Sequence, residues 1–552
     1  MKSPDQLRRR NVISIMAFVF VVFACLFALL RSGNIFGVDG AFRCLEVFRH
    51  QTLFFHGNNH TLYPANVLVW SRFTGALGLR PDGAEEFYGI TQLMNCIAGA
   101  GCLAIIFYLM YLVAASTRLA LGVVLAYGFS KAFLLHATNS AEPLVGVFWS
   151  LVAMCFAVLS LRRKSIWPII ASALFFSLAM ATYQSTIFLA PAAIVLIWQS
   201  RSNRDEDRFL SRAPIIAVCE FTLAGIAGCA AIFGWAYWFQ GFRGFRGMIE
   251  HFFAHGDARV YLGVSAGKLS TVPIGMVRNI FPIVPYFTGL RNLLGGPKLT
   301  LISLLIVLGM LFAFIVVCLR RLAVNWSGLS AEVRASVLAA TVGFAFTIIP
   351  VIIWDPGYDK LWLQPLACLV FLIGIALKPI GMDVRNGLTV SRAFSVLFLV
   401  GVSLNLVWAV RSHETKLPDI RETQRLAAFL DKQDLLVGDW DSISTLYGYG
   451  WSENGEFISF PSEAVLNGAE SVVHLREAVG ETQRRGGRVY FLSLLDVPQN
   501  TWDSFLGSRC GVPYSELGSY RTHSRIRATF YEQSSQVFLR QLDLTDATNV
   551  SR

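Results

Sequence analysis

The sequence predicts an α-helical polytopic membrane protein of about eleven transmembrane helices, followed by a small extracytoplasmic α/β domain at the C-terminal end. Hydrophobic residues make up 54% of the 552 positions and charged residues 15%, whereas soluble domains average about 25% charged residues. The hydrophobic residues form runs of about 18 residues or more, long enough to cross a hydrocarbon layer of about 30 Å as a helix. After Arg411 the sequence becomes polar, which predicts a folded domain outside the membrane.

The first hydrophobic run follows three consecutive arginines and extends from Val12 to Leu30. It is longer than the core of a signal peptide and no small-x-small cleavage site follows it, so we expect an uncleaved helix with a cytoplasmic N-terminus. The other runs are 87–114, 118–135, 143–161, 166–181, 183–198, 213–238, 298–319, 334–353, 361–377 and 391–410.

The stretch 166–198 fits either one interrupted helix or two short ones. With two helices, the basic loop after Leu161 faces the same side as the other short basic loops, which lie between 201–212, 320–334 and 378–392. The excess of Lys and Arg in cytoplasmic loops therefore favours two helices. It also explains the net charge of +11 without nucleic acid as a partner. In this topology the outer segments are 31–86, 136–142, 239–297, 354–360 and the C-terminal region. We expect any functional residues to lie in these segments.

The C-terminal region alternates predicted helices and strands, which is typical of an α/β domain. A helix is expected from Pro418 to Lys432, and buried strands are expected at 435–440 and 488–495. A second helix, capped by Ser462, is expected to run to about Arg484 and to end at Gly486-Gly487. The predicted domains are 1–411 in the membrane and 412–552 outside it.

Three outer segments place ionisable residues next to a membrane helix. The first contains Asp39 and Arg43, followed by a segment from His56 to Pro64 that includes His60. A carboxylate at the mouth of a helix bundle can act as a general base toward a hydroxyl. By spacing alone, Asp39 fits equally a solvated loop residue or a helix cap.

The second segment runs from His136 to Pro143 and contains Glu142, which fits a cap for the next helix or a residue of an active-site cavity. The third contains Tyr358, Lys360 and Pro365. The ammonium of Lys360 suits a lipid phosphate, and it also fits a lysine that extends along a helix end toward the interface.

Together these segments resemble the GT-C superfamily of membrane glycosyltransferases, in particular protein O-mannosyltransferase-like enzymes and lipid A aminoarabinose transferases. The resemblance covers 1–411 and lies in an acid in the first outer loop (Asp39), a second acid in the next (Glu142), and an aromatic-basic-proline segment before a late helix (Tyr358, Lys360, Pro365). The first acid stands in Val-Asp-Gly without a paired acid, and Lys360 replaces an arginine common in relatives.

The resemblance implies an inverting transfer of a sugar from a polyprenyl-phosphate carrier to a glycan, lipid or protein acceptor on the non-cytoplasmic face. Asp39 would be the base, Lys360 with Arg43 would stabilise the departing lipid phosphate, and Glu142 would hold the acceptor, the sugar or a divalent cation. No other cofactor is implied. Residues expected to bind substrate are Arg43, His56, His60, Tyr358 and Lys360. A bacterial inner membrane is the expected location, with the C-terminal domain in the periplasm.

Two alternatives stay open. A transporter or flippase for lipid-linked sugars would place charges deep within its helices, and here Glu220 is the clearest charge inside a hydrophobic run. A metal site at His251 and His255, four residues apart with Asp257 nearby, competes with a helix lying on the membrane surface. We assign no metal ligand.

Overall fold

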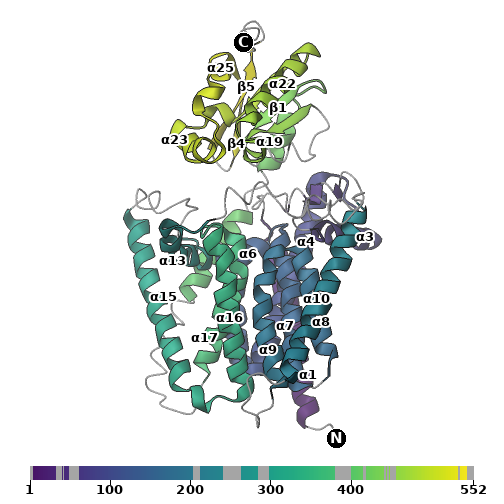
Figure 1. Cartoon of the computed structure of the whole chain (residues 1–552), viewed down its shortest axis with the longest axis vertical. Coiled ribbons are helices and arrows are strands. Elements are labelled where there is room, and N and C mark those ends of the chain that lie inside the picture. The colour runs from purple at the N-terminus through teal and green to yellow at the C-terminus, as the bar shows by residue number, and fades with distance from the viewer. Residues whose placement is uncertain are drawn as a thin grey trace.

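The computed structural model shows a long helical bundle with a small α/β domain beyond one end (Figure 1). The N-terminus lies at the opposite end of the bundle. The residues that the structure describes are 4–32, 40, 43–45, 47–48, 61–163, 165–202, 212–239, 263–283, 298–378, 399–413, 418–439, 443, 447, 455–532 and 535–543.

Each predicted hydrophobic run coincides with a helix or a broken helix over its described residues. The bundle contains α1 (Pro4–Leu29), α3 (Tyr63–Ala76), α4 (Ala84–Ala114), α5 (Thr117–Gly128), α6 (Lys131–Ala137), α7 (Glu142–Arg162), α8 (Trp167–Thr182), α9 (Ala190–Arg201), α10 (Arg212–Phe239), α13 (Ala266–Ile280), α15 (Lys298–Val324), α16 (Ala331–Ile353) and α17 (Leu363–Leu377). Short 3-10 helices are η1 (Gln184–Leu189), η2 (Trp326–Gly328) and η3 (Asp359–Trp362). Residues 399–413 are also helical.

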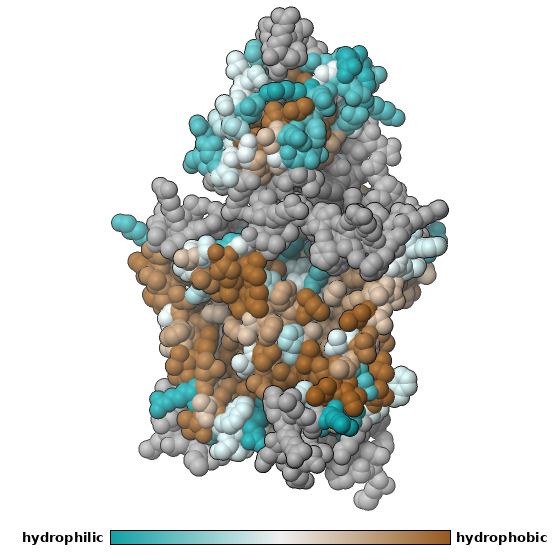
Figure 2. Space-filling view, in the orientation of Figure 1, coloured by the Kyte–Doolittle hydropathy of each residue, from teal (hydrophilic) through white to brown (hydrophobic). Residues whose placement is uncertain are grey.

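Within the described ranges, seven helices are long and apolar enough to cross a membrane. The pair α5 and α6, bent by 74°, is an eighth if counted as one span. Their outward side chains form a hydrophobic surface around the middle of the bundle, with hydrophilic residues toward both ends (Figure 2). Such a belt can be accommodated by lipid and not by water, so the chain is an integral membrane protein.

The stretch 166–198 forms two helices that turn back on each other. Helix α8 ends at Thr182, an extended residue and η1 follow, and α9 begins at Ala190. The guanidinium of Arg201, at the end of α9, donates to the carbonyl of Ser165 just before α8, with an N···O distance of 3.1 Å. The chain therefore returns to the end at which α8 began, as the distribution of basic loops predicted.

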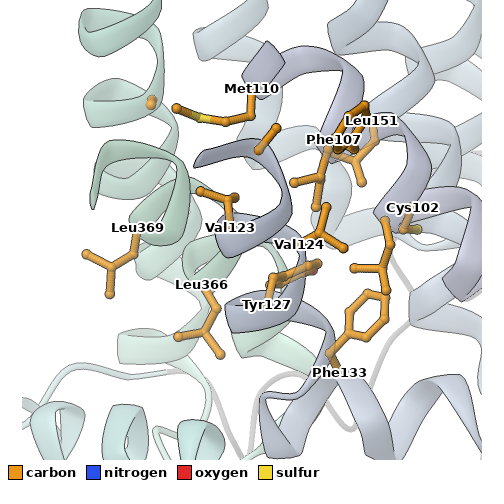
Figure 3. Packing of buried hydrophobic residues seen from close by; sticks show 14 of the residues in the cluster. Cys102, Phe107, Met110, Val123, Val124, Tyr127, Phe133, Leu151, Leu366 and Leu369 are labelled. Carbon is orange, nitrogen blue, oxygen red and sulfur yellow. The ribbon is translucent and has the colours of Figure 1, made fainter. Parts of the chain in front are cut away.

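The core of the bundle lies where α4, α5, α6 and α17 meet (Figure 3). Tyr127 is fully buried there, with its ring centroid 4.6 Å from that of Phe133. Its hydroxyl donates to the carbonyl of Leu363 at the start of α17, with an O···O distance of 2.8 Å. Aromatic rings of this size stabilise such contacts by burying a large apolar area. This contact anchors the start of α17, and with it the loop that carries Lys360.

The C-terminal domain is α/β, as predicted. Its five strands are β1 (Leu435–Gly438), β2 (Glu456–Ser459), β3 (Val489–Leu492), β4 (Ser524–Glu532) and β5 (Ser535–Leu542), in the order β2-β1-β3-β5-β4. The first three pair in parallel, and β5 pairs antiparallel with β3 and β4. Its longer helices are α19 (Pro418–Ala427), α21 (Phe460–Asn467) and α22 (Glu470–Arg484). Shorter turns complete it: η5 (Leu494–Asp496), α23 (Gln499–Trp502), a π-turn (Asp503–Gly507), α24 (Ser508–Cys510), η7 (Tyr514–Leu517) and α25 (Gly518–Thr522).

One predicted helix of this domain is divided in two. Gly468 has a φ of +59°, in the region that favours glycine, and it separates α21 from α22. The prediction that Ser462 caps the helix is therefore wrong, because Ser462 lies inside α21, whose N-cap is Ser459. The predicted end is confirmed: Gly486 has a φ of +77°, and the amide of Gly487 donates to the carbonyl of Thr482 at 2.9 Å.

Candidate active site

Glu142 begins α7 at the end of the bundle nearest the C-terminal domain, and its side chain is 2% exposed. Pro143 follows it in the first helical turn, where proline needs no hydrogen-bond partner for its nitrogen. A carboxylate at a helix N-terminus also interacts favourably with the helix dipole. The Nζ of Lys360 lies 3.7 Å from its Oε1. Two residues more than 200 positions apart are thus paired in a protected site.

Lys360 is held by the loop between α16 and α17. The indole nitrogen of Trp362 donates to the carbonyl of Pro356 at 2.8 Å, and the amide of Gly357 donates to Asp355 at 2.7 Å. The ammonium of Lys360 lies 4.7 Å from the ring centroid of Tyr358, a cation–π contact. Three of the predicted site residues, Glu142, Tyr358 and Lys360, are therefore brought together.

A second ion-pair group surrounds Asp359, the neighbour of Lys360. Arg278 of α13 contacts both carboxylate oxygens of Asp359, at 2.8 and 3.3 Å, and also donates to the carbonyl of Gly357. Lys131 of α6 lies 3.5 Å from the same carboxylate. The sequence reasoning did not place Arg278 or Asp359 in the site. A signal was present in the sequence, since Arg278 is the charged residue in the largely apolar stretch from Val272 to Ile280.

These two groups are almost enclosed and rich in cations. Lys131 and Arg278 have side-chain exposures of 9% and 5%, and Lys360 is 16% exposed. Buried charges require partners because desolvation is costly. The ammonium of Lys360, the most exposed of the three cations, is the one best placed to contact an anionic ligand.

The first outer loop is fastened to the turn before Glu142. Ser140, fully buried, lies 2.8 Å from the Sγ of Cys44 and 2.9 Å from the hydroxyl of Tyr63. Burial raises the pKa of Cys44 to about 12, which favours the protonated thiol in this contact. Arg43, half-buried, precedes Cys44 in the same helical segment. Cys44 and Tyr63, at either end of the segment that contains His56 and His60, therefore both contact the turn that precedes Glu142.

Gly40 lies directly against this turn. A Cβ at this position would collide with the carbonyl oxygen of Ser140 and would lie 2.8 Å from the Cα of Ala141. We expect Gly40→Ala to destabilise the protein by about 1–3 kcal/mol, the usual cost of overpacking. Thermal unfolding in detergent measures this, with Gly83→Ala as the matched control because a Cβ there meets open space. Equal unfolding temperatures for the two variants would contradict the close packing.

Asp39, His56 and His60 lie outside the described residues, as do His251, His255 and Asp257. In the part of the chain that the structure describes, no three His, Cys, Asp or Glu side chains are grouped closely enough to hold a metal ion. The roles predicted for Asp39, His56 and His60, and for a divalent cation, stay predictions.

No protein-family model matches the sequence, and no curated protein sequence matches it either. Solved structures do match over nearly the whole chain. The apo crystal structure of ArnT from Cupriavidus metallidurans aligns with a TM-score of 0.57 over 98% of both chains, at 12% identity. The structure of the same protein bound to undecaprenyl phosphate aligns with a TM-score of 0.56 over 97% of this chain and 98% of that one, also at 12% identity. The chain thus has the fold of ArnT, which confirms the predicted fold class of a helical membrane protein with a small C-terminal α/β domain.

Proposed function

We propose that this protein is a glycosyltransferase that moves a sugar from a polyprenyl-phosphate carrier to an acceptor, on the membrane face that bears the C-terminal domain. The observation that carries the proposal is the enclosed pair of ion-pair groups around Glu142 and Asp359, which places the cations Lys131, Arg278 and Lys360 in one protected part of the bundle. It lies at one end of a bundle whose fold is shared with ArnT, a protein solved with undecaprenyl phosphate. A lipid phosphate is an anion that can reach such a site from the surrounding bilayer.

The proposed reaction is a single displacement. An acceptor hydroxyl attacks the anomeric carbon from the side opposite the phosphate, its proton passes to Asp39, and the bond between that carbon and the phosphate oxygen breaks. The carrier leaves as polyprenyl phosphate, and the configuration of the sugar is inverted. Asp39 suits the base because it directly precedes Gly40, and Gly40 packs against the residues just before Glu142.

Each remaining predicted residue has a role in this proposal. Lys360 stabilises the charge that develops on the departing phosphate, an interaction that is strong in an enclosed site. Arg43 assists it, and the ring of Tyr358 supports the Lys360 ammonium. Glu142 positions Lys360 and the acceptor. His56 and His60 bind the acceptor or the carrier headgroup.

We further propose that the protein lies in a bacterial inner membrane, with a cytoplasmic N-terminus and a periplasmic C-terminal domain. The excess of Lys and Arg in the short loops between the hydrophobic runs supports this orientation. Arg162 and Glu332 form an ion pair of 2.6 Å at the end of the bundle opposite the site. The acceptor is a glycan, a lipid or a protein.

The test is transfer of label by purified protein in lipid, from radiolabelled polyprenyl-phosphate sugars to acceptors in a membrane extract. We expect Asp39→Asn to lower transfer by a factor of about 10²–10⁴, the usual contribution of a general base. Glu220→Gln is the matched control, since Glu220 lies on α10 away from the site. Equal transfer by wild type and Asp39→Asn would remove Asp39 as the base, and a lack of transfer by the wild type would contradict the proposed function.

A further inference from the structure

Buried polar atoms without a hydrogen-bond partner gather at the same end of the bundle as the ion pairs. Such atoms are costly, because each has given up water without gaining a partner. In the described part of the bundle, atoms of this kind occur on the side chains of Thr61, Asn95, His136, Thr186, Asn279, Gln364 and Asn405. Their concentration at one end marks the part of the bundle in which a bound ligand would supply the missing hydrogen-bond partners.

His136 is the most informative of these residues. It lies on α6, five residues after Lys131 and six before Glu142, and it is 5% exposed. Neither of its ring nitrogens has a hydrogen-bond partner among the described residues. Helix α6, which carries His136 and Lys131, packs against η3, α7 and α13, the elements that carry Lys360, Glu142 and Arg278. His136 therefore lies in the same part of the bundle as the two ion-pair groups.

Asn95 of α4 supports the turn that carries His136. Its side-chain nitrogen donates to the carbonyls of His136, at 3.3 Å, and Ala141, at 2.6 Å. Its side-chain oxygen, also buried, has no partner among the described residues. The amide nitrogen thus fixes the turn that carries His136, and the amide oxygen of the same side chain is a buried acceptor in this part of the bundle.

The chemistry of these atoms selects the class of ligand. A neutral imidazole has one N–H donor and one lone pair that accepts, and an amide oxygen accepts only. A phosphate oxygen accepts hydrogen bonds, so it can pair with the imidazole N–H. It cannot pair with the imidazole lone pair or with the amide oxygen of Asn95, because both of these are acceptors. A cation accepts no hydrogen bond, so it would leave the imidazole N–H without a partner. Hydroxyl groups both donate and accept, and a sugar presents several of them at once.

From this arrangement we infer that His136, with Asn95 beside it, binds hydroxyl groups of the sugar that is transferred. The inference rests on the proposed function and adds a recognition site to it. Lys360 then contacts the phosphate of the carrier, and His136 contacts the sugar attached to that phosphate. The acceptor could also supply the hydroxyls if it is a glycan, and the experiment separates the two sources.

The experiment compares dissociation constants for the full-length protein in nanodiscs. The probes are bare undecaprenyl phosphate and undecaprenyl phosphate carrying mannose, glucose, galactose or arabinose. We expect at least one loaded carrier to bind the wild type more tightly than the bare carrier. His136→Phe, which keeps a flat ring without nitrogens, should weaken that loaded carrier tenfold or more and change the bare carrier less than twofold. His136→Gln, which keeps a donor and an acceptor, should recover part of the loss.

His474→Phe is the matched control, because that histidine is half-exposed in the C-terminal domain. Thermal unfolding establishes that each variant is folded. Equal weakening of bare and loaded carriers by His136→Phe would overturn the inference, as would unchanged binding of every loaded carrier. A rise in the KM of the acceptor with unchanged binding of the donor would assign the histidine to the acceptor and also contradict it. In each of these cases transfer by the wild type would leave the proposed function standing.

Discussion

Lys360→Met is expected to lower sugar transfer by a factor of about 10²–10³, the range found when one donor to a developing oxyanion is removed. The lipid phosphate gains negative charge as its bond to the sugar breaks, and the ammonium of Lys360 is the cation paired with Glu142 at that point. At 16% exposure the charge is poorly screened by water, so its interaction with phosphate is stronger than at an open surface. The measurement is the initial rate of transfer in proteoliposomes.

The same substitution breaks the ion pair between Lys360 and the buried carboxylate of Glu142, and breaking a buried pair costs about 3–5 kcal/mol. The double variant Glu142→Gln with Lys360→Met separates the two effects, because it should regain thermal stability without regaining transfer. Lys268→Met is the matched control: Lys268 is at the same end of the bundle and donates to the carbonyls of Gly263 and Ile353. Transfer by Lys360→Met at more than half the wild-type rate would exclude Lys360 from the reaction.

Asp359→Asn is expected to be the most destabilising single change in the site, by about 3–5 kcal/mol. It removes the negative charge that both Arg278 and Lys131 contact, and these two cations are themselves 5% and 9% exposed. The measurement is the unfolding temperature of the protein in detergent. A second substitution, Lys131→Met, removes one of the two cations and should recover part of the loss. Additive loss in the double variant would show that the two residues are not energetically coupled.

The membrane part of the fold could be predicted from the sequence because the bilayer imposes one simple constraint. A segment that crosses it must be apolar over its whole length and must satisfy its own backbone hydrogen bonds. Each hydrophobic run therefore predicts a helix, and the basic loops decide how the run at 166–198 divides. The break between α5 and α6 was not predicted, because it depends on packing at Phe129 and Ser130 and not on hydropathy.

The candidate site could be predicted in part. Glu142, Tyr358 and Lys360 were found because each lies beside a helix end in a short outer segment. The contacts of Asp359 with Arg278 and Lys131 were missed. They join residues that are 81 and 228 positions apart in the sequence, and only the packing of α13 and α6 brings these residues together. The hairpin of β4 and β5 was missed although charged and apolar residues alternate from Arg525 to Ala528, which is a strand signal. The sequence between the two strands lacks the Asn-Gly or Asp-Gly pair that marks a tight hairpin turn.

The most direct test of the account is mass spectrometry of the lipid pool, after purified protein is incubated in liposomes with undecaprenyl-phosphate sugars and an acceptor extract. We predict that the wild type converts one of these carriers into bare undecaprenyl phosphate, that the sugar appears on an acceptor in equal amount, and that Lys360→Met does neither. A carrier that stays chemically intact while moving between leaflets would contradict the account and identify a flippase.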